Sequence, residues 1–437
     1  MHTTCRTTER RLTASKALLA ALAALALATL APAGAGAGQV VFDPEAGAIR
    51  CLEFPAEAPC RLAQVLEADR AGNWGKVTYD RASDTYTVRT DLVVGTGDGT
   101  QSVLQVGGPD AKRERLVMYG DLIVAEPKKR GWQIYQAHNG LRIGLYEDDT
   151  VTPTVLFACE EPGERELVVH GGNIFWVCHA KVSALTEKPE NRFALTVDGR
   201  IVWGDLRLIR STISWFTEAR INTDADAYVR RMIFEHGGEL RGDQYLVDSA
   251  VRHMDCGLRD HGGLQAVLVR CRFENNTMNY ELLYGPWGIL AVDCFFGAAQ
   301  EPPALRAYTW PRGRHEGQTT RPAFVSRRHL VVRVRDASGA PVAGAQVAVA
   351  CEQDAPGAVG RGIAVTGADG ATPGLRETDA LYVTDEVTRP EAGTGEVTTH
   401  AYTYAVTVAA DGYAPVTVEH VDPDQTWQVK DVVLARE

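Results

Sequence analysis

The fold is decided by a five-residue pattern that recurs along the chain: Ile209-Arg210-Ser211-Thr212-Ile213, Val229-Arg230-Arg231-Met232-Ile233, Val247-Asp248-Ser249-Ala250-Val251, Val269-Arg270-Cys271-Arg272-Phe273 and Val292-Asp293-Cys294-Phe295-Phe296. These segments begin at residues 209, 229, 247, 269 and 292, so the steps between them are 20, 18, 22 and 23 residues. A near-constant period of this size indicates one supersecondary unit per repeat, stacked on its neighbours. Because side chains alternate along a strand, we expect the first, third and fifth positions to point into the stack. Arg231 interrupts the small third position, which leaves the register of that repeat open.

Two repeat architectures have periods near this one. Leucine-rich repeats need an L-x-x-L-x-L-x-x-N spacing, which the chain lacks. A parallel β-helix needs only short strands joined by turns, with like residues stacked in columns, and the recurring segments meet that requirement. In this pattern the chain resembles the right-handed parallel β-helix proteins of the pectin-lyase-like superfamily, over roughly residues 80–300.

The regions on either side of the repeats differ in character. Residues 1–37 have a basic start, an apolar run and small residues before a cleavage site, which is the order of a secretory signal peptide. Leucine and valine fall at helical spacing over residues 61–70 and predict a short helix within an N-terminal cap, 38–80. The coil is placed at 81–300, and a basic linker rich in proline and arginine at 301–328.

A second architecture begins at residue 329. Short strand-like runs alternate with the turn sequences Asp336-Ala337-Ser338-Gly339 and Asp411-Gly412-Tyr413. Residues 329–437 thereby resemble the carboxypeptidase regulatory-like (transthyretin-like) β-sandwich, which implies a non-catalytic support or adhesion module. The predicted fold class is all-β: a right-handed parallel β-helix followed by a small Ig-like, transthyretin-like β-sandwich.

The signal peptide predicts an exported bacterial protein that is secreted, periplasmic or held at the cell surface. Its apolar run, residues 17–31, is short for a membrane span, and no membrane span is expected after cleavage. Removing this segment, whose net charge is +3, changes the net charge of the chain from −11 to −14. Such an acidic surface excludes nucleic acid as a partner and argues against a generic polyanion binder, but it leaves room for a local basic patch.

The cysteines suit an oxidising compartment but not a metal site. Cys51 and Cys60 bracket a short loop, and a disulfide between them is predicted, with two free thiols as the alternative. Cys271 and Cys294 occupy one column of the repeats, where a buried thiol stack is favoured over a disulfide. The cysteines lack the close pairing of a zinc site, so no metal is predicted and no cofactor is evident. A Ca²⁺ requirement is not indicated by any motif.

Carboxylates and imidazoles in the middle of the repeats form the candidate catalytic set: Glu235, Asp255 and His261. Glycoside hydrolysis needs two carboxylates facing the sugar, and a lyase needs a base together with a cation that neutralises a uronate. The alternative is solvated surface, because no complete N-x-D, D-D or G-H-G signature of the pectin hydrolases is present. His261 also belongs to one of three His-Gly-Gly triplets, which we interpret as turns between strands.

Candidate substrate-binding residues flank the catalytic set: His253, Arg270, Arg272 and Trp287. The second positions of the repeats would also form an outward column, made of Arg210, Arg230, Asp248, Arg270 and Asp293. Successive rungs of such a column lie about 4.8 Å apart. Its charged side chains would form a groove that hydrogen-bonds sugar hydroxyls or carboxylates. The alternative is an ordinary salt-bridged ladder.

These features together predict a carbohydrate-binding protein whose β-helix flank holds a polysaccharide or a cell-surface glycan, and which processes it as a lyase or glycoside hydrolase. The basis for that prediction is analogy between folds together with the polar columns. The alternative is a non-enzymatic surface, structural or adhesion protein, in which the coil is a rigid spacer and the sandwich docks to a partner.

Overall fold

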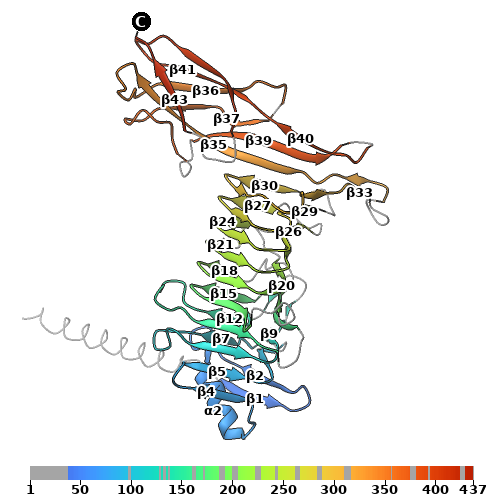
Figure 1. The fold of residues 1–437 in the computed structure, drawn as a ribbon. Coiled ribbons are helices and arrows are strands. Elements are labelled where there is room, and N and C mark those ends of the chain that lie inside the picture. Colours follow the sequence, from blue (N-terminus) through green and yellow to red (C-terminus); the bar gives the residue numbers. More distant parts are fainter. Residues whose placement is uncertain are drawn as a thin grey trace, which may run out of the picture.

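The computed structural model describes residues 38–96, 100–126, 129–130, 134–135, 138–159, 164–170, 173–186, 192–198, 205–221, 228–241, 245–260, 266–282, 288–309, 316–355, 357–374, 380–391, 394–423 and 429–436. These residues form a long coil of short strands, and a sandwich of longer strands lies at the C-terminal end of the coil (Figure 1). The predicted signal peptide, residues 1–37, lies outside the described residues. No helix among the described residues is long and apolar enough to cross a membrane.

Three sheets run along the coil, and we name them sheets A, B and C. Sheet A contains β1 (Gln39–Asp43), β2 (Ala48–Leu52), β6 (Asp91–Val94), β9 (Leu122–Val124), β14 (Arg165–His170), β17 (Phe193–Asp198), β20 (Phe216–Ile221), β23 (Glu239–Arg241), β26 (Cys256–Asp260), β29 (Glu281–Leu282) and β32 (Ala304–Leu305). In its coil part, sheet B contains β3 (Cys60–Arg61), β7 (Val103–Val106), β12 (Gly140–Ile143), β15 (Ile174–Cys178), β18 (Asp205–Ile209), β21 (Tyr228–Arg230), β24 (Tyr245–Val247), β27 (Ala266–Val269), β30 (Ile289–Val292) and the start of β35 (Phe324–Asp336). Sheet C contains β4 (Val77–Asp80), β5 (Thr85–Val88), β8 (Arg115–Met118), β13 (Thr154–Phe157), β16 (Lys181–Ala184), β19 (Thr212–Ser214), β22 (Ile233–Glu235), β25 (Ala250–Arg252), β28 (Arg272–Glu274) and β31 (Phe295–Phe296).

Each turn of the coil passes through the sheets in the order A, B, C. The chain runs through β23, β24 and β25, and then returns to sheet A in β26, which pairs parallel with β23. The antiparallel pairs β1–β2 and β4–β5 lie at the N-terminal end. Two short hairpins are formed by β10 (Lys129–Arg130) with β11 (Ile134–Tyr135), and by β33 (Tyr308–Thr309) with β34 (Thr319–Thr320). This arrangement confirms the predicted all-β class and the parallel β-helix.

Stacked side chains fill the interior of the coil. Alternate residues of each strand point inward and lie directly above their equivalents in the neighbouring strand. Phe273 stacks on Phe296 with ring centroids 4.8 Å apart, and Phe157 stacks on Phe193 at the same distance. Columns of this kind explain why like residues recur at a fixed period.

The recurring five-residue pattern forms a corner between sheets B and C. In the third repeat Val247 ends β24, Asp248 has a positive φ of 52°, and Ala250 begins β25. The prediction that the first, third and fifth positions share one inward face is therefore wrong for the first position. The inward residue of β24 is Leu246, which belongs to the coil core, whereas Val247 lies on the outer side. The chain bends at the second position, which changes the face that the third and fifth residues present.

The register of the interrupted repeat is one residue later than the pattern suggested. Arg230 pairs with Val247, and Arg231 has a positive φ of 55°. Arg231, not Arg230, therefore occupies the corner position equivalent to Arg210 and Asp248. Met232 takes the buried place that serine or cysteine fills in the other repeats. The predicted outward column is corrected accordingly and reads Arg210, Arg231, Asp248, Arg270 and Asp293.

A short helix closes the N-terminal end of the coil, as predicted. Helix α2 (Leu62–Gly72) buries Leu62, Val65 and Leu66 against the coil core. Asn73 ends the helix in the left-handed conformation, with φ 50°, and its backbone N–H bonds back to the last turn.

The sandwich shares its first strand with the coil. The N-terminal part of β35 pairs parallel with β30, and its C-terminal part pairs parallel with β43 (Val429–Leu434). The predicted boundary between residues 328 and 329 falls within β35. One sheet of the sandwich joins β35 and β43 to β37 (Val359–Arg361), β39 (Leu381–Pro390) and β40 (Val397–Ala401). The other contains β36 (Gln346–Cys351), β38 (Ile363–Val365), β41 (Tyr404–Ala409) and β42 (Val416–Val421), and valine-rich side chains pack between the two sheets.

Candidate functional site

The predicted site residues that the structure describes do not meet in one cleft. Glu235 lies on sheet C, where both the Nη2 and Nε atoms of Arg252 donate to its carboxylate, at 2.8 and 2.9 Å. Asp255 lies at the start of sheet A and is largely exposed, 3.7 Å from Arg192. His261 and Trp287 lie outside the described residues. The described candidate acids therefore sit on two different sheets, and Glu235 is held by an ion pair.

His253 belongs to an aromatic column at the corner between sheets C and A. Its ring stacks on His236 at 4.8 Å, and His236 stacks on Trp215 at 4.6 Å. All three residues have a positive φ, between 54° and 59°. Gly238 follows at the same corner, where a Cβ atom would lie 2.0 Å from the carbonyl oxygen of Thr217. The His236 triplet is thus a turn, as interpreted, and its glycine is required by the close approach of the preceding turn of the coil.

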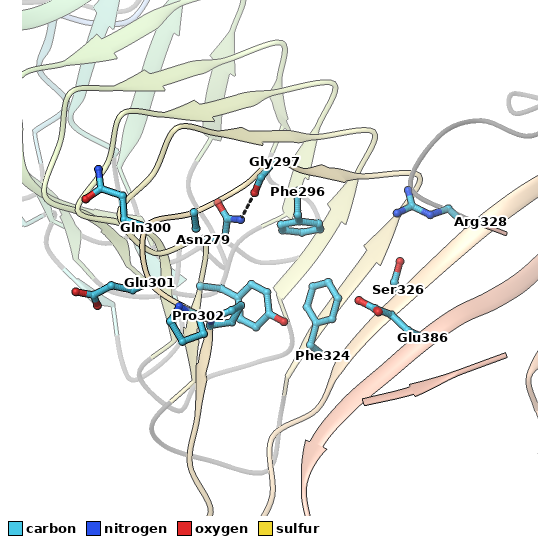
Figure 2. A pocket seen from close by; sticks show the side chains of 13 residues that line it. Asn279, Phe296, Gly297, Gln300, Glu301, Pro302, Phe324, Ser326, Arg328 and Glu386 are labelled. Atoms are coloured by element: carbon cyan, nitrogen blue, oxygen red, sulfur yellow. Dashed lines mark hydrogen bonds between the residues drawn. The ribbon is translucent and has the colours of Figure 1, made fainter. Parts of the chain in front are cut away.

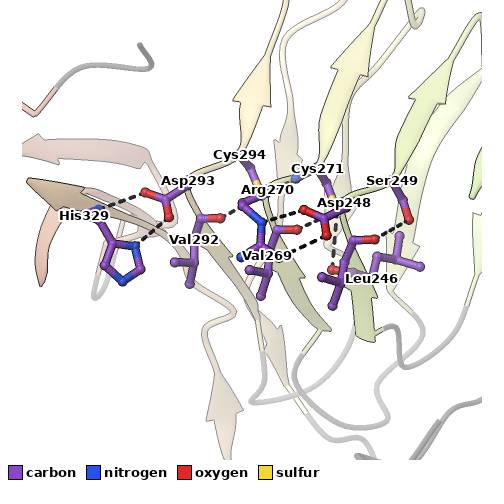
Figure 3. Close-up of polar contacts among 11 residues, drawn as sticks. Leu246, Asp248, Ser249, Val269, Arg270, Cys271, Val292, Asp293, Cys294 and His329 are labelled. Carbon is purple, nitrogen blue, oxygen red and sulfur yellow. Dashed lines mark hydrogen bonds and ion pairs between the residues drawn. The ribbon is translucent and has the colours of Figure 1, made fainter. Parts of the chain in front are cut away.

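The predicted arginines are both ion-paired. Arg270 donates two hydrogen bonds to Asp248, at 2.5 and 3.1 Å (Figure 3). The next corner residue, Asp293, accepts a hydrogen bond from the backbone of His329 at 2.8 Å and contacts its ring at 2.6 Å. Arg272 lies on sheet C and binds Glu274 at 3.0 Å. The upper part of the outward column is thus the salt-bridged ladder that we gave as the alternative.

The lower part of the same column carries basic side chains. Three successive corner positions are occupied by His179, Arg210 and Arg231. Backbone hydrogen bonds join these corners from one turn to the next. The N–H of His179 donates to the carbonyl oxygen of Ile209 at 3.0 Å, and the N–H of Arg210 donates to that of Arg230 at 3.1 Å. These residues surround a hollow of ≈ 320 Å³ on the coil surface, which we name the corner hollow. Its lining is completed by Tyr146, Ile209, Arg230 and Asp248.

The corner hollow carries an excess of positive charge. Arg210 and Arg231 are exposed, and Arg210 lies 3.9 Å from the carboxylate of Asp149, which is itself 69 % exposed. A pair this long and this accessible is screened by water and does not neutralise the arginine. Asp248 closes one end of the hollow but is already bound by Arg270. The hollow is therefore a local basic patch on an acidic protein.

Aromatic side chains adjoin this patch on the outer face of sheet B. Arg142, Trp176 and Arg207 lie in register on neighbouring strands, and each guanidinium sits over the indole, at 4.4 and 4.5 Å from its centroid. Arg207 also lies 4.9 Å from the ring of Tyr146. Aromatic and guanidinium groups together suit a ligand that has both a ring face and an anionic group.

Sequence reasoning named Arg210, Arg230 and Asp248 in the outward column but missed Arg231, His179 and Tyr146. Arg231 was assigned to the wrong register because Met232 stands where the other repeats have serine or cysteine. His179 and Tyr146 lie in the first half of the coil, where the repeats are longer and less regular. A positive φ at successive corners identifies His179, Arg210 and Arg231 as equivalent positions, and the residue types alone do not reveal it.

A second hollow, the sheet A groove, contains Asp255 and measures ≈ 590 Å³. Its two least exposed carboxylates are neutralised: Arg259 contacts Glu239 and binds Glu281 at 2.6 Å. Arg241 likewise contacts Glu239 and binds Glu218 at 3.2 Å. Burial raises the pKa of the Cys256 thiol to about 11, so it is protonated at neutral pH and is not a nucleophile. The groove offers hydrogen bonds but no free acid–base pair among its described residues.

Six of the eight described cysteines are buried, among them the two pairs that the sequence singled out. The sulfur atoms of Cys51 and Cys60 lie 3.4 Å apart in the core, and the contact between them, together with burial, raises the pKa of Cys60. The structure thus brings the predicted pair together, and the disulfide stays a prediction. The Cys271 backbone N–H lies 3.3 Å from the sulfur of Cys294, which agrees with a thiol stack.

No cluster of three or more His, Cys, Asp or Glu side chains within the described ranges is arranged to hold a metal ion. The geometry of the coil surface therefore has to be interpreted from its own residues. Compared with models of protein families, with curated proteins and with solved structures, the chain matches none of them.

Proposed function

We propose that this chain binds an anionic polysaccharide, such as a polyuronate, along the corner between sheets B and C. The observation that carries the proposal is the corner hollow, in which His179, Arg210 and Arg231 occupy three successive turns of the coil. Successive turns are spaced by about 4.8 Å, which is close to the length of one sugar residue in an extended chain. Each carboxylate of a bound polymer would then meet one basic corner residue.

Because the rest of the protein is acidic, we expect the corner hollow to select its ligand by the spacing of the carboxylates and not by negative charge alone. The full chain has a net charge of −11, so a flexible polyanion is repelled wherever it leaves the column. Beside the hollow, Arg207 stacks on Tyr146 and Trp176, and this aromatic and guanidinium surface would contact the rings and carboxylates of a bound polymer. A polymer with both rings and regularly spaced carboxylates fits this surface better than DNA or polyphosphate.

Binding is tested by calorimetry with polygalacturonate, using dextran as the neutral polymer and double-stranded DNA as the unrelated polyanion. We expect R210Q and R231Q each to weaken polygalacturonate binding about 5- to 10-fold, since each removes one charge-assisted contact. Arg272→Gln is the matched control, because Arg272 is exposed but lies on sheet C and pairs with Glu274. Equal affinity of R231Q and the unaltered protein would refute the site. No binding to any polymer would favour the structural or adhesion alternative.

Lyase chemistry is a second candidate function, favoured by the imidazole in the same hollow. Cleavage of a uronate by β-elimination needs a cation to neutralise the carboxylate and a base for the adjacent C–H proton. Arg210 and Arg231 would supply the first. His179, as the neutral imidazole, would take the C–H proton while the C=C bond forms and the glycosidic C–O bond breaks, and it would return the proton to the leaving oxygen. The measurement is ultraviolet absorbance from the unsaturated product. A lyase would form it in the unaltered protein and lose it in H179Q while retaining binding; a binding protein would form none.

A further inference from the structure

A cavity of ≈ 480 Å³ lies where the last turn of the coil meets the sandwich, and we name it the junction cavity (Figure 2). The residues just before β29, the end of β31 and the segment that follows β31 line one side, and β35 and β39 line the other. Its size falls in the range of small-molecule sites, roughly 300–1,000 Å³. The cavity is separate from the corner hollow and shares none of its lining residues.

One wall of the junction cavity is aromatic. Tyr280 stacks on Phe324 with ring centroids 4.5 Å apart, and Phe296 meets Phe324 edge to face at 5.2 Å. Figure 2 shows Phe296 and Phe324 around the hollow, with Glu386 beside Phe324. The rings hold one another in place, so the wall is formed before any ligand arrives. The negative faces of such rings attract cations.

The cationic group of the cavity is already neutralised. Arg328 is buried, donates to Asp385 at 3.2 Å and also donates to the carbonyl oxygen of Cys294. Ser326 donates to the same carboxylate at 3.1 Å. With its charge matched by Asp385, Arg328 leaves no positive charge for an anionic ligand to meet.

Two polar groups in the cavity have no partner among the described residues. Glu386 is half-buried, and no hydrogen bond or ion pair to its carboxylate is formed there. Tyr280 is 6 % exposed, and its hydroxyl is likewise without a partner in the described part of the chain. Burial raises the pKa of Glu386, and burial together with the nearby Glu386 raises the pKa of Tyr280. Glu386 is thus the unpaired acid of the cavity, and exposed Glu301 adds a second carboxyl group at the rim.

We infer that the junction cavity binds a small organic cation, an amine or ammonium that carries an apolar ring or chain. The ammonium would pair with Glu386, whose carboxylate lacks a partner, and its apolar part would lie against Phe296 and Phe324. The Tyr280 hydroxyl would accept a hydrogen bond from the same N–H group. A cation is the opposite of the anionic polymer proposed for the corner hollow, so the two sites are tested independently.

The test uses the full chain with benzylamine and benzyl alcohol, which differ in charge but have the same ring. Binding is measured by calorimetry and by shifts in the ligand's NMR signals. We expect benzylamine to bind at least 10-fold more tightly than benzyl alcohol, E386Q to abolish that preference, and Y280F to weaken it 2- to 5-fold. Glu419→Gln, an exposed acid in the sandwich, is the control and should change nothing.

The pH dependence of benzylamine binding provides a second test of the role of Glu386. Benzylamine stays protonated below neutral pH, so its binding should fall as Glu386 takes up a proton, at a pH above the ordinary range of a glutamate. An affinity for benzylamine no greater than that for benzyl alcohol, or one unchanged in E386Q, would overturn the inference. Binding of neutral monosaccharides in place of the amine would overturn it too. Cooperative melting of E386Q separates loss of the site from loss of the fold.

Discussion

The coil and the sandwich bury their strands in different ways, and the difference decides where a ligand is expected. In the coil every strand lies above its equivalent, so one side-chain type repeats along the axis, inside and outside. In the sandwich antiparallel strands face each other across a core of valine and alanine around Tyr404. Only the coil therefore presents cationic groups at a regular spacing, which a polymer with its own repeat would match.

The outer surfaces of the coil and the sandwich also differ in the side chains that they expose. The coil's outer columns are mostly charged or aromatic, as at Arg210 and Trp176. The sandwich instead exposes Ile363 and Val365 on β38, an edge strand, and Val433 on β43. In the part of the chain that the structure describes, the two regions meet through β35, the contacts around Arg328 and the walls of the junction cavity. Whether they unfold as one unit depends on that junction.

The junction gives the largest expected effect. Asp385→Asn leaves the buried Arg328 guanidinium without its counter-charge, and breaking a buried ion pair in this way costs about 3–5 kcal/mol. Because Arg328 also binds the last turn of the coil, we expect calorimetry to resolve two melting transitions where the unaltered protein has one. Asp431→Asn, an exposed acid on β43, is the control. A single unshifted transition in D385N would show that the ion pair does not join the two regions.

Core truncations distinguish the two regions next. Leu268→Ala removes a fully buried side chain from the coil and should cost about 3 kcal/mol. Val406→Ala in the sandwich removes less buried surface and should cost about 2 kcal/mol. In the D385N background each truncation should lower only the transition of its own region, as followed by calorimetry. If both transitions fall together, the regions remain coupled by β35 alone.

The coil was predictable because its columns require like residues at each turn. Ser211, Cys271 and Cys294 mark the same corner and identify the period from the sequence alone. The positive φ at each corner was not predictable, since it is uncommon for any residue other than glycine, and arginine has no preference for it. It is imposed by the stack: the Arg270 N–H donates to the Val292 carbonyl in the next turn at 2.8 Å. Tertiary hydrogen bonding here overrides local preference.

The sites were harder to predict than the fold, for two physical reasons. A single larger residue, Met232, shifted the apparent register by one position, and with it the placement of Arg231. The junction cavity joins Tyr280 of the coil to Glu386 of the sandwich, and no periodic pattern relates residues from two architectures. Columns are encoded locally, whereas a junction depends on how two regions meet.

The ladder on the outside of the coil should contribute little to stability. Asp248→Asn breaks the pair with Arg270, whose side chains are each about a quarter exposed, and should cost about 0.5–1 kcal/mol in urea unfolding. The cost should shrink at high salt, because the pair is partly accessible to solvent. Thr417→Ala on β42, an exposed position, provides the sandwich control. A cost that is large and independent of salt would mean that the ladder, and not the core, holds the turns of the coil together.

The smallest expected effect is a gain in stability, and it comes from a substitution at the junction. The folded-state pKa of Glu386 is raised by burial, so its carboxylate form is less favourable in the folded than in the unfolded protein. That cost is fully present above the folded pKa and vanishes below the unfolded value, where the side chain is protonated in both states. E386Q should therefore raise the free energy of unfolding at pH 8, and with it the melting temperature. For a half-buried group the gain should be less than about 1 kcal/mol, and near pH 4 there should be no change. Loss of stability at pH 8 would mean that Glu386 has a partner that holds the junction together, and the cavity would then be structural rather than a binding site.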